Sequence, residues 1–206
     1  MPRKYLSSIN PSFQHPLVQE LKVYADTHHV PIMQDEGIHF LVQLIQIKQA
    51  KKVLEIGTAI GYSSLIMALF GDVEVTTIER DEACYRKAVD TVNRAGLSDK
   101  IHLIYGDAKE VVVSDADFDI IFIDAAKASY IQFFEKFSEN LKSGGVIVSD
   151  NLLFHGFVEH PEEISNRNRK QLVKKIDRFN HFLINHSKFD SYIYAIGDGI
   201  SVSIKK

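Results

Sequence analysis

The chain has 206 residues, of which 45% are hydrophobic, 25% charged and 10% aromatic, and its formal net charge is −3. This composition is typical of a soluble globular protein and excludes disordered, collagen-like and fibrous chains. The length fits a single domain over residues 1–206 with one sizeable core. Because the charge is near neutral, a nucleic-acid partner would need a local basic patch.

Cysteine usage and the N-terminal residues indicate the compartment. Cys84 is the only cysteine, so the sequence predicts neither a disulfide framework nor a cysteine-based zinc site, and the expected location is cytoplasmic. The first ten residues hold no apolar signal-peptide core, and no apolar run approaches the roughly 18 residues of a membrane span. The sequence predicts a protein that is neither exported nor membrane-embedded.

Two helices are predicted first, at about residues 14–28 and 34–48, within an N-terminal part (1–50) that serves as a lid or a subunit contact. Alternating strands and helices follow. Short β-branched runs predict strands at 53–57, 73–79, 101–105, 118–124 and 145–149. Helical spacing predicts helices at 62–70, 81–95 and 128–141, the last ending at a Ser143-Gly144-Gly145 C-cap signal. This alternation predicts a parallel sheet with right-handed crossovers.

The C-terminal quarter departs from the alternation. The pattern predicts a loop at 151–161, a helix at about 166–186 and two strands at 191–196 and 200–204. Gly197-Asp198-Gly199 separates the two strands, as expected of a tight turn. The chain is therefore expected to end in an antiparallel hairpin at the sheet edge.

A glycine-containing turn follows the first predicted strand. Gly57 and Gly61 lie in it and allow the backbone to pass close to a ligand. Because neither G-x-G-x-x-G nor GK[ST] is present, a dinucleotide or nucleoside triphosphate is not the expected ligand. Glu79 ends the second predicted strand, where an acid can accept hydrogen bonds from both ribose hydroxyls. A purely structural turn is the alternative, and Glu79 favours the cofactor site.

The pattern E-x-G-x-x-x-G, made by Glu55, Gly57 and Gly61, resembles motif I of the Rossmann-like methyltransferases that use S-adenosylmethionine (SAM). The resemblance implies that this loop meets the methionine end of SAM. Three further residues are expected at the cofactor's adenine or carboxylate: Asp107, Ala108 and Ser63. Taken alone, the aspartate and the serine are equally well explained as residues at helix starts.

Two predicted strands end in acids, Asp124 and Asp150, and Asn151 follows the second. Because the carboxyl ends of parallel strands share one edge, these side chains are expected to converge on the cofactor crevice. Two carboxylates and an amide, without His or Cys, suit Mg²⁺ or another hard divalent cation. Either aspartate alone is more simply a helix cap. Together with Lys127, a candidate base for a substrate hydroxyl, they predict a metal site.

The set D-x-x-K at 124–127 with D-N at 150–151 resembles the metal-dependent catechol and caffeoyl-CoA O-methyltransferase family, over nearly the whole chain. The resemblance implies an α/β, class I SAM-methyltransferase fold: a mostly parallel seven-stranded sheet with helices on both faces, ending in the hairpin. It implies catalytic roles for Lys127 and Asp124, with Asp124 also beside the cofactor, and contact of Met33 with the methionine end. A homodimer is implied as well.

Within this family the resemblance is closest to the bacterial enzymes that methylate 5-hydroxyuridine at the tRNA wobble position. The shared segments are 28–33 (HHVPIM), 57–63 (GTAIGYS), 124–127 (DAAK) and 150–154 (DNLLF), together with the basic helix near the C-terminus. Catechol enzymes carry bulky residues where Ala125 and Ala126 stand here. The small side chains indicate wider walls than a flat catechol pocket needs.

Residues 167–178 contain six basic residues and one acid. At about 100° per residue, one helix face carries a basic stripe of Arg167, Lys170, Lys174 and Arg178. The opposite face carries an apolar stripe of Leu172, Ile176, Phe179 and Leu183. A solvated surface explains such a run as readily as phosphate contact does.

Three functions follow from these patterns. The favoured one is a SAM- and Mg²⁺-dependent O-methyltransferase acting on tRNA 5-hydroxyuridine. The second is the same enzyme class acting on a catechol-like small molecule, since both substrates offer two adjacent oxygens. The third is a SAM-binding protein without catalysis, against which the intact set of Asp124, Lys127, Asp150 and Asn151 argues.

Overall fold

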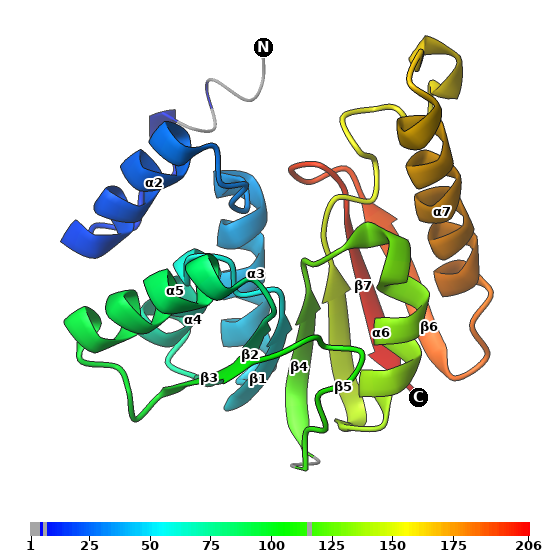
Figure 1. The fold of residues 1–206 in the computed structure, drawn as a ribbon. Helices are drawn as coiled ribbons and strands as arrows, with labels where there is room; N and C mark the ends of the chain where they lie inside the picture. Colours follow the sequence, from blue (N-terminus) through cyan, green and yellow to red (C-terminus); the bar gives the residue numbers. More distant parts are fainter. Residues whose placement is uncertain (1–4, 6–7, 115–116) are drawn as a thin grey trace.

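The computed structural model of the chain describes residues 5, 8–114 and 117–206. Its centre is a seven-stranded sheet in the order β3-β2-β1-β4-β5-β7-β6 (Figure 1). The parallel strands are β1 (Lys52–Ile56), β2 (Glu74–Glu79), β3 (Ile101–Tyr105), β4 (Phe118–Ile123) and β5 (Leu141–Ser149). β7 (Ile200–Lys205) pairs antiparallel with β5, and β6 (Phe189–Tyr194) pairs antiparallel with β7. The predicted sheet and terminal hairpin are confirmed.

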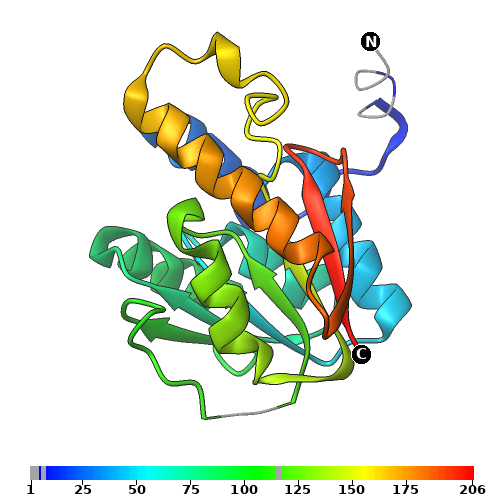
Figure 2. The ribbon, with the colours of Figure 1, turned by 90° about the vertical axis from the view of Figure 1, so that its right-hand side faces the viewer.

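Helices cover both faces of the sheet (Figure 1). One face carries α2 (Pro16–His28), α3 (Asp35–Lys48), α4 (Tyr62–Phe70) and α5 (Glu82–Ala95). The other carries α6 (Tyr130–Ser138) and α7 (Arg167–Ile184), with the short 3₁₀ turns η1 (Lys127–Ser129) and η2 (Pro161–Glu163) beside them. Figure 2 shows α7 lying across this second face above α6. None of the helices in the described part is long and apolar enough to cross a membrane.

Strand alternation divides the core into two apolar layers. On β1, Val53 packs on the α2–α5 side, whereas Leu54 and Ile56 pack against α6 and α7. All three side chains are fully buried. Burying such a side chain contributes about 1.5–3 kcal/mol, which is why parallel strands covered on both faces are rich in Val, Ile and Leu.

The two N-terminal helices belong to the first of these layers. α2 begins with Pro16 at its first position, and α3 begins with Asp35 and Glu36, whose negative charges favour a helix N-terminus. Leu21 of α2 and Ile38 of α3 are buried in the core shared with α4. The segment joining the helices borders a pocket at the sheet edge through Pro31, Ile32 and Met33, and its role as a lid stays a prediction. The homodimer stays a prediction, and residues 1–4 and 6–7 of the 1–50 segment lie outside the described residues.

The predicted helix at 128–141 is wrong at its C-terminal end. α6 ends at Ser138, and β5 already begins at Leu141, so Ser143-Gly144-Gly145 lies within the strand and does not cap a helix. Leu141 pairs with Phe118 and Val146 pairs with Ile120, so the register shifts between these pairs. A bulge of this kind admits glycine as readily as a helix end does, and the local sequence does not separate the two.

The strand order reverses between β1 and β4, because β2 and β3 lie on one side of β1 and β4 and β5 lie on the other. In open parallel sheets, ligands bind beyond the carboxyl ends of the strands at such a reversal. The turns after β1, β2, β4 and β5 all lie at this edge, which is where the chain places its pocket.

Candidate active site

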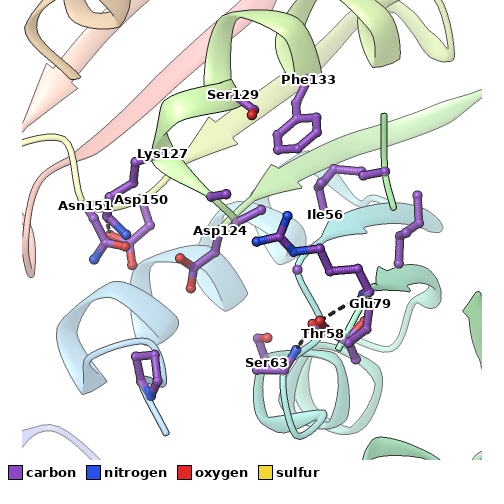
Figure 3. A pocket seen from close by; sticks show the side chains of 18 of the residues that line it. Ile56, Thr58, Ser63, Glu79, Asp124, Lys127, Ser129, Phe133, Asp150 and Asn151 are labelled. Carbon is purple, nitrogen blue, oxygen red and sulfur yellow. Dashed lines mark hydrogen bonds between the residues drawn. The ribbon is translucent and has the colours of Figure 1, made fainter. Parts of the chain in front are cut away.

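A pocket opens at the carboxyl edge of the sheet (Figure 3). Segments from all five parallel strands line it, and the segment between α2 and α3 closes one side with Pro31, Ile32 and Met33. Ten of the residues predicted from sequence line the pocket: Met33, Gly57, Ser63, Glu79, Asp107, Ala108, Asp124, Lys127, Asp150 and Asn151. Glu55 and Gly61 do not line it.

The glycine turn brings β1 against the end of β4. Gly57 has φ of 103°, and a Cβ at this position would lie 2.1 Å from the carbonyl oxygen of Asp124. No side chain fits in that space, so glycine is required both by the backbone angle and by the close approach. The turn is further held by the Gly57 N–H, which donates to the carbonyl of Ile78 at 3.0 Å.

Glu55 lies beneath the turn and does not contact the pocket, which corrects its predicted role. Its fully buried carboxylate accepts hydrogen bonds from the hydroxyls of Ser63, Ser64 and Thr77. Burial raises the pKa of Glu55 to about 7, against the opposing effect of these hydroxyls. Glu55 therefore positions Ser63, which does line the pocket.

Gly61 is also a positioning residue. It precedes α4 with φ of 84° and packs against Ala88 of α5. Thr58, which was not predicted from the sequence, also lines the pocket and shares a 2.5 Å hydrogen bond with Thr77. A threonine inside a glycine turn carries no distinctive sequence signal.

Glu79 ends β2 and is held by main-chain donors. Its Oε2 accepts the Ala59 N–H at 2.8 Å, and its Oε1 accepts the N–H groups of Arg80 and Asp81 at 2.9 and 2.8 Å. A carboxylate has about four acceptor sites, so one remains for a hydroxyl in the pocket. Arg80, which was not predicted from the sequence, lines the pocket with its guanidinium 3.9 Å from the carboxylate of Asp107.

The opposite side of the pocket is acidic. Figure 3 shows Asp124, Asp150, Asn151 and Lys127 gathered there, with Glu79, Thr58 and Ser63 across the pocket. Asp124 follows β4, and Asp150 follows β5 and is 3% exposed. The Oδ1 of Asp150 accepts the N–H of Asn151 at 2.7 Å, and the Tyr130 hydroxyl donates to the main-chain carbonyl of Asp150 at 3.0 Å.

Burial disfavours the charged forms of both carboxylates. Burial, and then the nearby charge of Asp124, raise the pKa of Asp150 to about 7. Burial raises the pKa of Asp124 as well, and the Lys127 ammonium opposes that rise. A bound cation would favour the charged forms of both groups.

The donor set fits a hard divalent ion. Carboxylate and amide oxygens are ligands that Mg²⁺ prefers. Within the described residues, no group of three or more His, Cys, Asp or Glu side chains could hold a metal, so a site here depends on the amide of Asn151. That residue adopts φ of 62°, a left-handed conformation that directs the chain away from β5.

Helix α7 lies outside the pocket and presents its basic residues to solvent. Arg167, Lys170, Lys174 and Arg178 are exposed, and no ion pair involves them within the described part of the chain. The buried face consists of Val173, Ile176, Phe179 and Leu183. The prediction of Leu172 in this face is wrong, because Val173 occupies the buried position and Leu172 is half-buried.

This fold and site define a Rossmann-like methyltransferase: a glycine turn after β1, an acid at the end of β2 and a pocket at the strand reversal. The model of the O-methyltransferase family matches residues 7–206. The chain belongs to this family, and it is an O-methyltransferase. The enzyme class predicted from sequence is confirmed.

Individual relatives extend the match. A Staphylococcus aureus crystal structure, provisionally named a caffeoyl-CoA O-methyltransferase, is 36% identical, with a TM-score of 0.90 over 100% of this chain and 97% of that one. A caffeoyl-CoA O-methyltransferase of Populus kitakamiensis is 32% identical over 92% of this chain and 86% of its own length. A Bacillus cereus O-methyltransferase, crystallised in complex with SAH, is 26% identical, with a TM-score of 0.82 over 98% and 96% of the two chains.

Proposed function

We propose that this enzyme transfers the methyl group of SAM to the 5-hydroxyl of 5-hydroxyuridine at the wobble position of tRNA, with a divalent cation bound at the acidic side of the pocket. The observation that carries this proposal is the combination of Asp124, Asp150, Asn151 and Lys127 in one pocket with the exposed basic face of α7, whose N-terminal end lies at the same edge of the sheet (Figures 1 and 3).

SAM as the methyl donor is supported by the pocket itself. Glu79 offers an acceptor to a ribose hydroxyl, and the turn at Gly57 leaves space for a ligand against the backbone. Met33 lines the same pocket from the segment between α2 and α3. The Bacillus cereus relative with SAH supports the same cofactor class.

Asp124, Asp150 and Asn151 would hold the cation. When bound, a divalent cation supplies a Lewis acid that lowers the pKa of a substrate hydroxyl. Lys127 begins η1 in the same pocket and, as a neutral amine, would receive the hydroxyl proton and become an ammonium. Because the turn at Gly57 contacts the backbone of Asp124, this aspartate also lies beside the methyl donor.

The transfer is an in-line displacement, which requires donor and acceptor atoms about 3–3.5 Å apart. The pocket provides for this with two separate sides: Glu79 and Ser63 hold the donor, and the acidic residues hold the acceptor oxygens. The 5-hydroxyl and 4-carbonyl of 5-hydroxyuridine are adjacent oxygens that suit such a site.

The basic helix supports a nucleic-acid substrate. α7 contacts η1, which carries Lys127, and the N-terminal end of α7 lies at the edge of the sheet where β4 and β5 end (Figure 1). Exposed Arg and Lys side chains without acidic partners are available to phosphates. The small side chains of Ala125 and Ala126 beside the acidic set allow a bulky substrate to approach.

A second candidate is a catechol-like small molecule, favoured by the names of the Populus and Staphylococcus relatives. A catechol also offers two adjacent oxygens, so it suits the same acidic residues. It has no phosphates for α7 to contact.

Nucleoside mass spectrometry of tRNA from a strain that lacks the gene tests the proposal. We expect 5-methoxyuridine-type nucleosides to disappear and 5-hydroxyuridine to accumulate. Purified enzyme with SAM and Mg²⁺ should methylate that tRNA and leave caffeoyl-CoA unmodified. An unchanged nucleoside profile with turnover of caffeoyl-CoA would replace the first candidate by the second.

A further inference from the structure

The turn Gly197-Asp198-Gly199 between β6 and β7 reaches the loop that leaves the pocket after Asn151. Three hydrogen bonds join the two segments. The main-chain carbonyls of Asp198 and Gly199 accept the N–H groups of Leu153 and Leu152 at 2.9 and 3.0 Å. The Oδ1 of Asp198 accepts the N–H of His155 at 2.5 Å. Residues far apart in sequence therefore hold the first turn of the loop.

The two segments are in close contact. A Cβ on Gly199 would lie 2.8 Å from the main-chain nitrogen of Leu153, and φ of this glycine is 92°. Any larger residue would push Leu153 away. Glycine at position 199 is thus required by the packing of the loop as well as by the turn of the hairpin.

The loop held in this way has an unfavourable backbone. Asn151, Phe154 and His155 have φ of 62°, 46° and 59°, and Gly156 follows at 83°. Residues with side chains rarely adopt this left-handed region, and they remain there only where the surroundings determine the conformation. The hydrogen bonds from the turn hold the residues directly after Asn151 in this conformation.

Asp198 also contributes charge. The residue is 6% exposed, and among the described residues its Oδ2 has no hydrogen-bond partner. The nearest cationic candidate is Nδ1 of His155, 3.8 Å away on a side chain that is largely exposed. Through the N–H of His155, this carboxylate lies against the loop that directly follows Asp150 and Asn151. A third carboxylate therefore stands behind the two that face the pocket.

We propose that Asp198 is a positioning residue for the acceptor side of the active site. Its carboxylate holds the left-handed loop that begins at Asn151 and so sets the direction of the Asn151 side chain, while its charge favours a cation held by Asp124 and Asp150. The part of this inference that concerns the metal rests on the proposed function. The part that concerns the contact between the turn and the loop does not.

Two substitutions separate the hydrogen bond from the charge. Asp198→Asn keeps an oxygen that accepts the His155 N–H and removes the charge, whereas Asp198→Ala removes both. The matched control is Asp119→Ala. Asp119 accepts the N–H groups of Lys51 and Lys52 at 2.7 and 3.0 Å, but at the amino edge of the sheet. Like Asp198, it accepts main-chain N–H groups, at the opposite end of the strands, and its Oδ1 also pairs with Lys142 at 2.7 Å.

The primary measurement is hydrogen–deuterium exchange of residues 151–158. Mn²⁺ binding is measured by electron paramagnetic resonance and SAM binding by calorimetry, and all three experiments are done without the methyl acceptor. In Asp198→Ala we expect exchange of this loop to become at least tenfold faster and Mn²⁺ affinity to fall at least tenfold, with SAM affinity within twofold. Asp198→Asn should keep the loop protected and weaken Mn²⁺ about two- to fivefold. Asp119→Ala should lower the melting temperature without either effect.

Gly199→Ala tests the same contact without altering a carboxylate, and it keeps the proposal testable if Asp198→Ala does not fold. It should speed exchange of 151–158 as Asp198→Ala does. Unchanged loop exchange in Asp198→Ala or, if that variant is not folded, in Gly199→Ala overturns the proposal. So does faster exchange spread over the whole sheet, because that indicates a general loss of stability. Wild-type protein that binds no Mn²⁺ argues against the proposed metal, while the exchange measurement still decides the role of the turn.

Discussion

Gly57 and Asp124 meet through their backbones: a Cβ on Gly57 would lie 2.1 Å from the Asp124 carbonyl oxygen. This contact joins the turn that would hold the methyl donor to the residue that begins the acidic side of the pocket. Packing between β1 and β4 thus fixes the separation of these two sides of the pocket.

The first prediction concerns this contact. Gly57→Ala should lower the free energy of unfolding by about 1–3 kcal/mol and SAM affinity at least tenfold, because the methyl group collides with backbone that cannot move aside. Thermal unfolding and calorimetry measure the two effects. Gly96→Ala is the control, since Gly96 has φ of 65° with no atom within 4 Å of an added Cβ. It should cost stability alone; equal losses of SAM binding in both variants would contradict the role of the contact.

The two acidic residues should differ in their effects on the cofactor. Asp150→Ala should abolish turnover and leave SAM affinity within a few fold, because Asp150 faces the proposed metal and acceptor. Asp124→Ala should reduce both, since this residue also adjoins the turn at Gly57. Calorimetry with SAM, alongside methyl transfer to the proposed tRNA substrate, distinguishes the variants. Full activity in EDTA, or of Asp150→Ala, would exclude the metal assignment.

Metal affinity should depend on pH near neutrality. In the metal-free protein the pKa of Asp150 is about 7, so below that pH a bound cation must displace a proton. The apparent Mn²⁺ affinity should therefore fall roughly tenfold per pH unit as the pH drops below about 7. Titrations between pH 5.5 and 8.5, with Asp150→Asn as the comparison, measure the slope. A pH-independent affinity in the wild-type protein would contradict this assignment.

Glu55 should make the metal-free protein less stable as pH rises. Its pKa is about 7 when folded, against an ordinary value of 4.5, so the folded state holds the extra proton between these values. Stability is fully present below about pH 4.5 and decreases as the pH rises to about 7, by up to a few kcal/mol. Glu55→Gln, which stays neutral, should flatten this dependence in thermal melts at pH 5 and 8. An equally steep dependence in the variant would show that other groups cause it.

The basic face of α7 should control tRNA affinity. Lys170→Ala with Lys174→Ala should raise the KM for tRNA and flatten its salt dependence by about one to two phosphate contacts, each worth roughly 0.7–0.9 log units of affinity per log unit of salt. Turnover at saturating tRNA should change little, because phosphate contacts position the substrate. Lys48→Ala with Lys52→Ala removes the same charge at the opposite edge and should leave the slope unchanged. Equal slopes in all three proteins would indicate that the α7 face is merely solvated.

Local sequence pattern and residue type were sufficient to predict much of the structure of this protein. β-branched runs predicted the five parallel strands within a few residues, because strands buried on both faces must be apolar at successive positions. The acidic residues at the strand ends were predicted to lie together at one edge of the sheet, since parallel strands point the same way. These two regularities predicted the parallel sheet and the acidic edge of the pocket, and the family resemblance added the methyltransferase fold and further pocket residues such as Met33 and Ala108.

Other features depend on contacts between segments that are distant along the chain. Glu55 shares a motif with Gly57, yet strand alternation directs it beneath the turn toward Ser63 and Ser64 of α4. The Ser143-Gly144-Gly145 signal suits a helix end and a bulge equally, and pairing with β4 decided between them. Asp198 looked like part of an ordinary turn until the fold placed it against His155. Only the tertiary structure could decide these points, because residue type determines which hydrogen bonds a side chain can make, whereas packing determines which partners it meets.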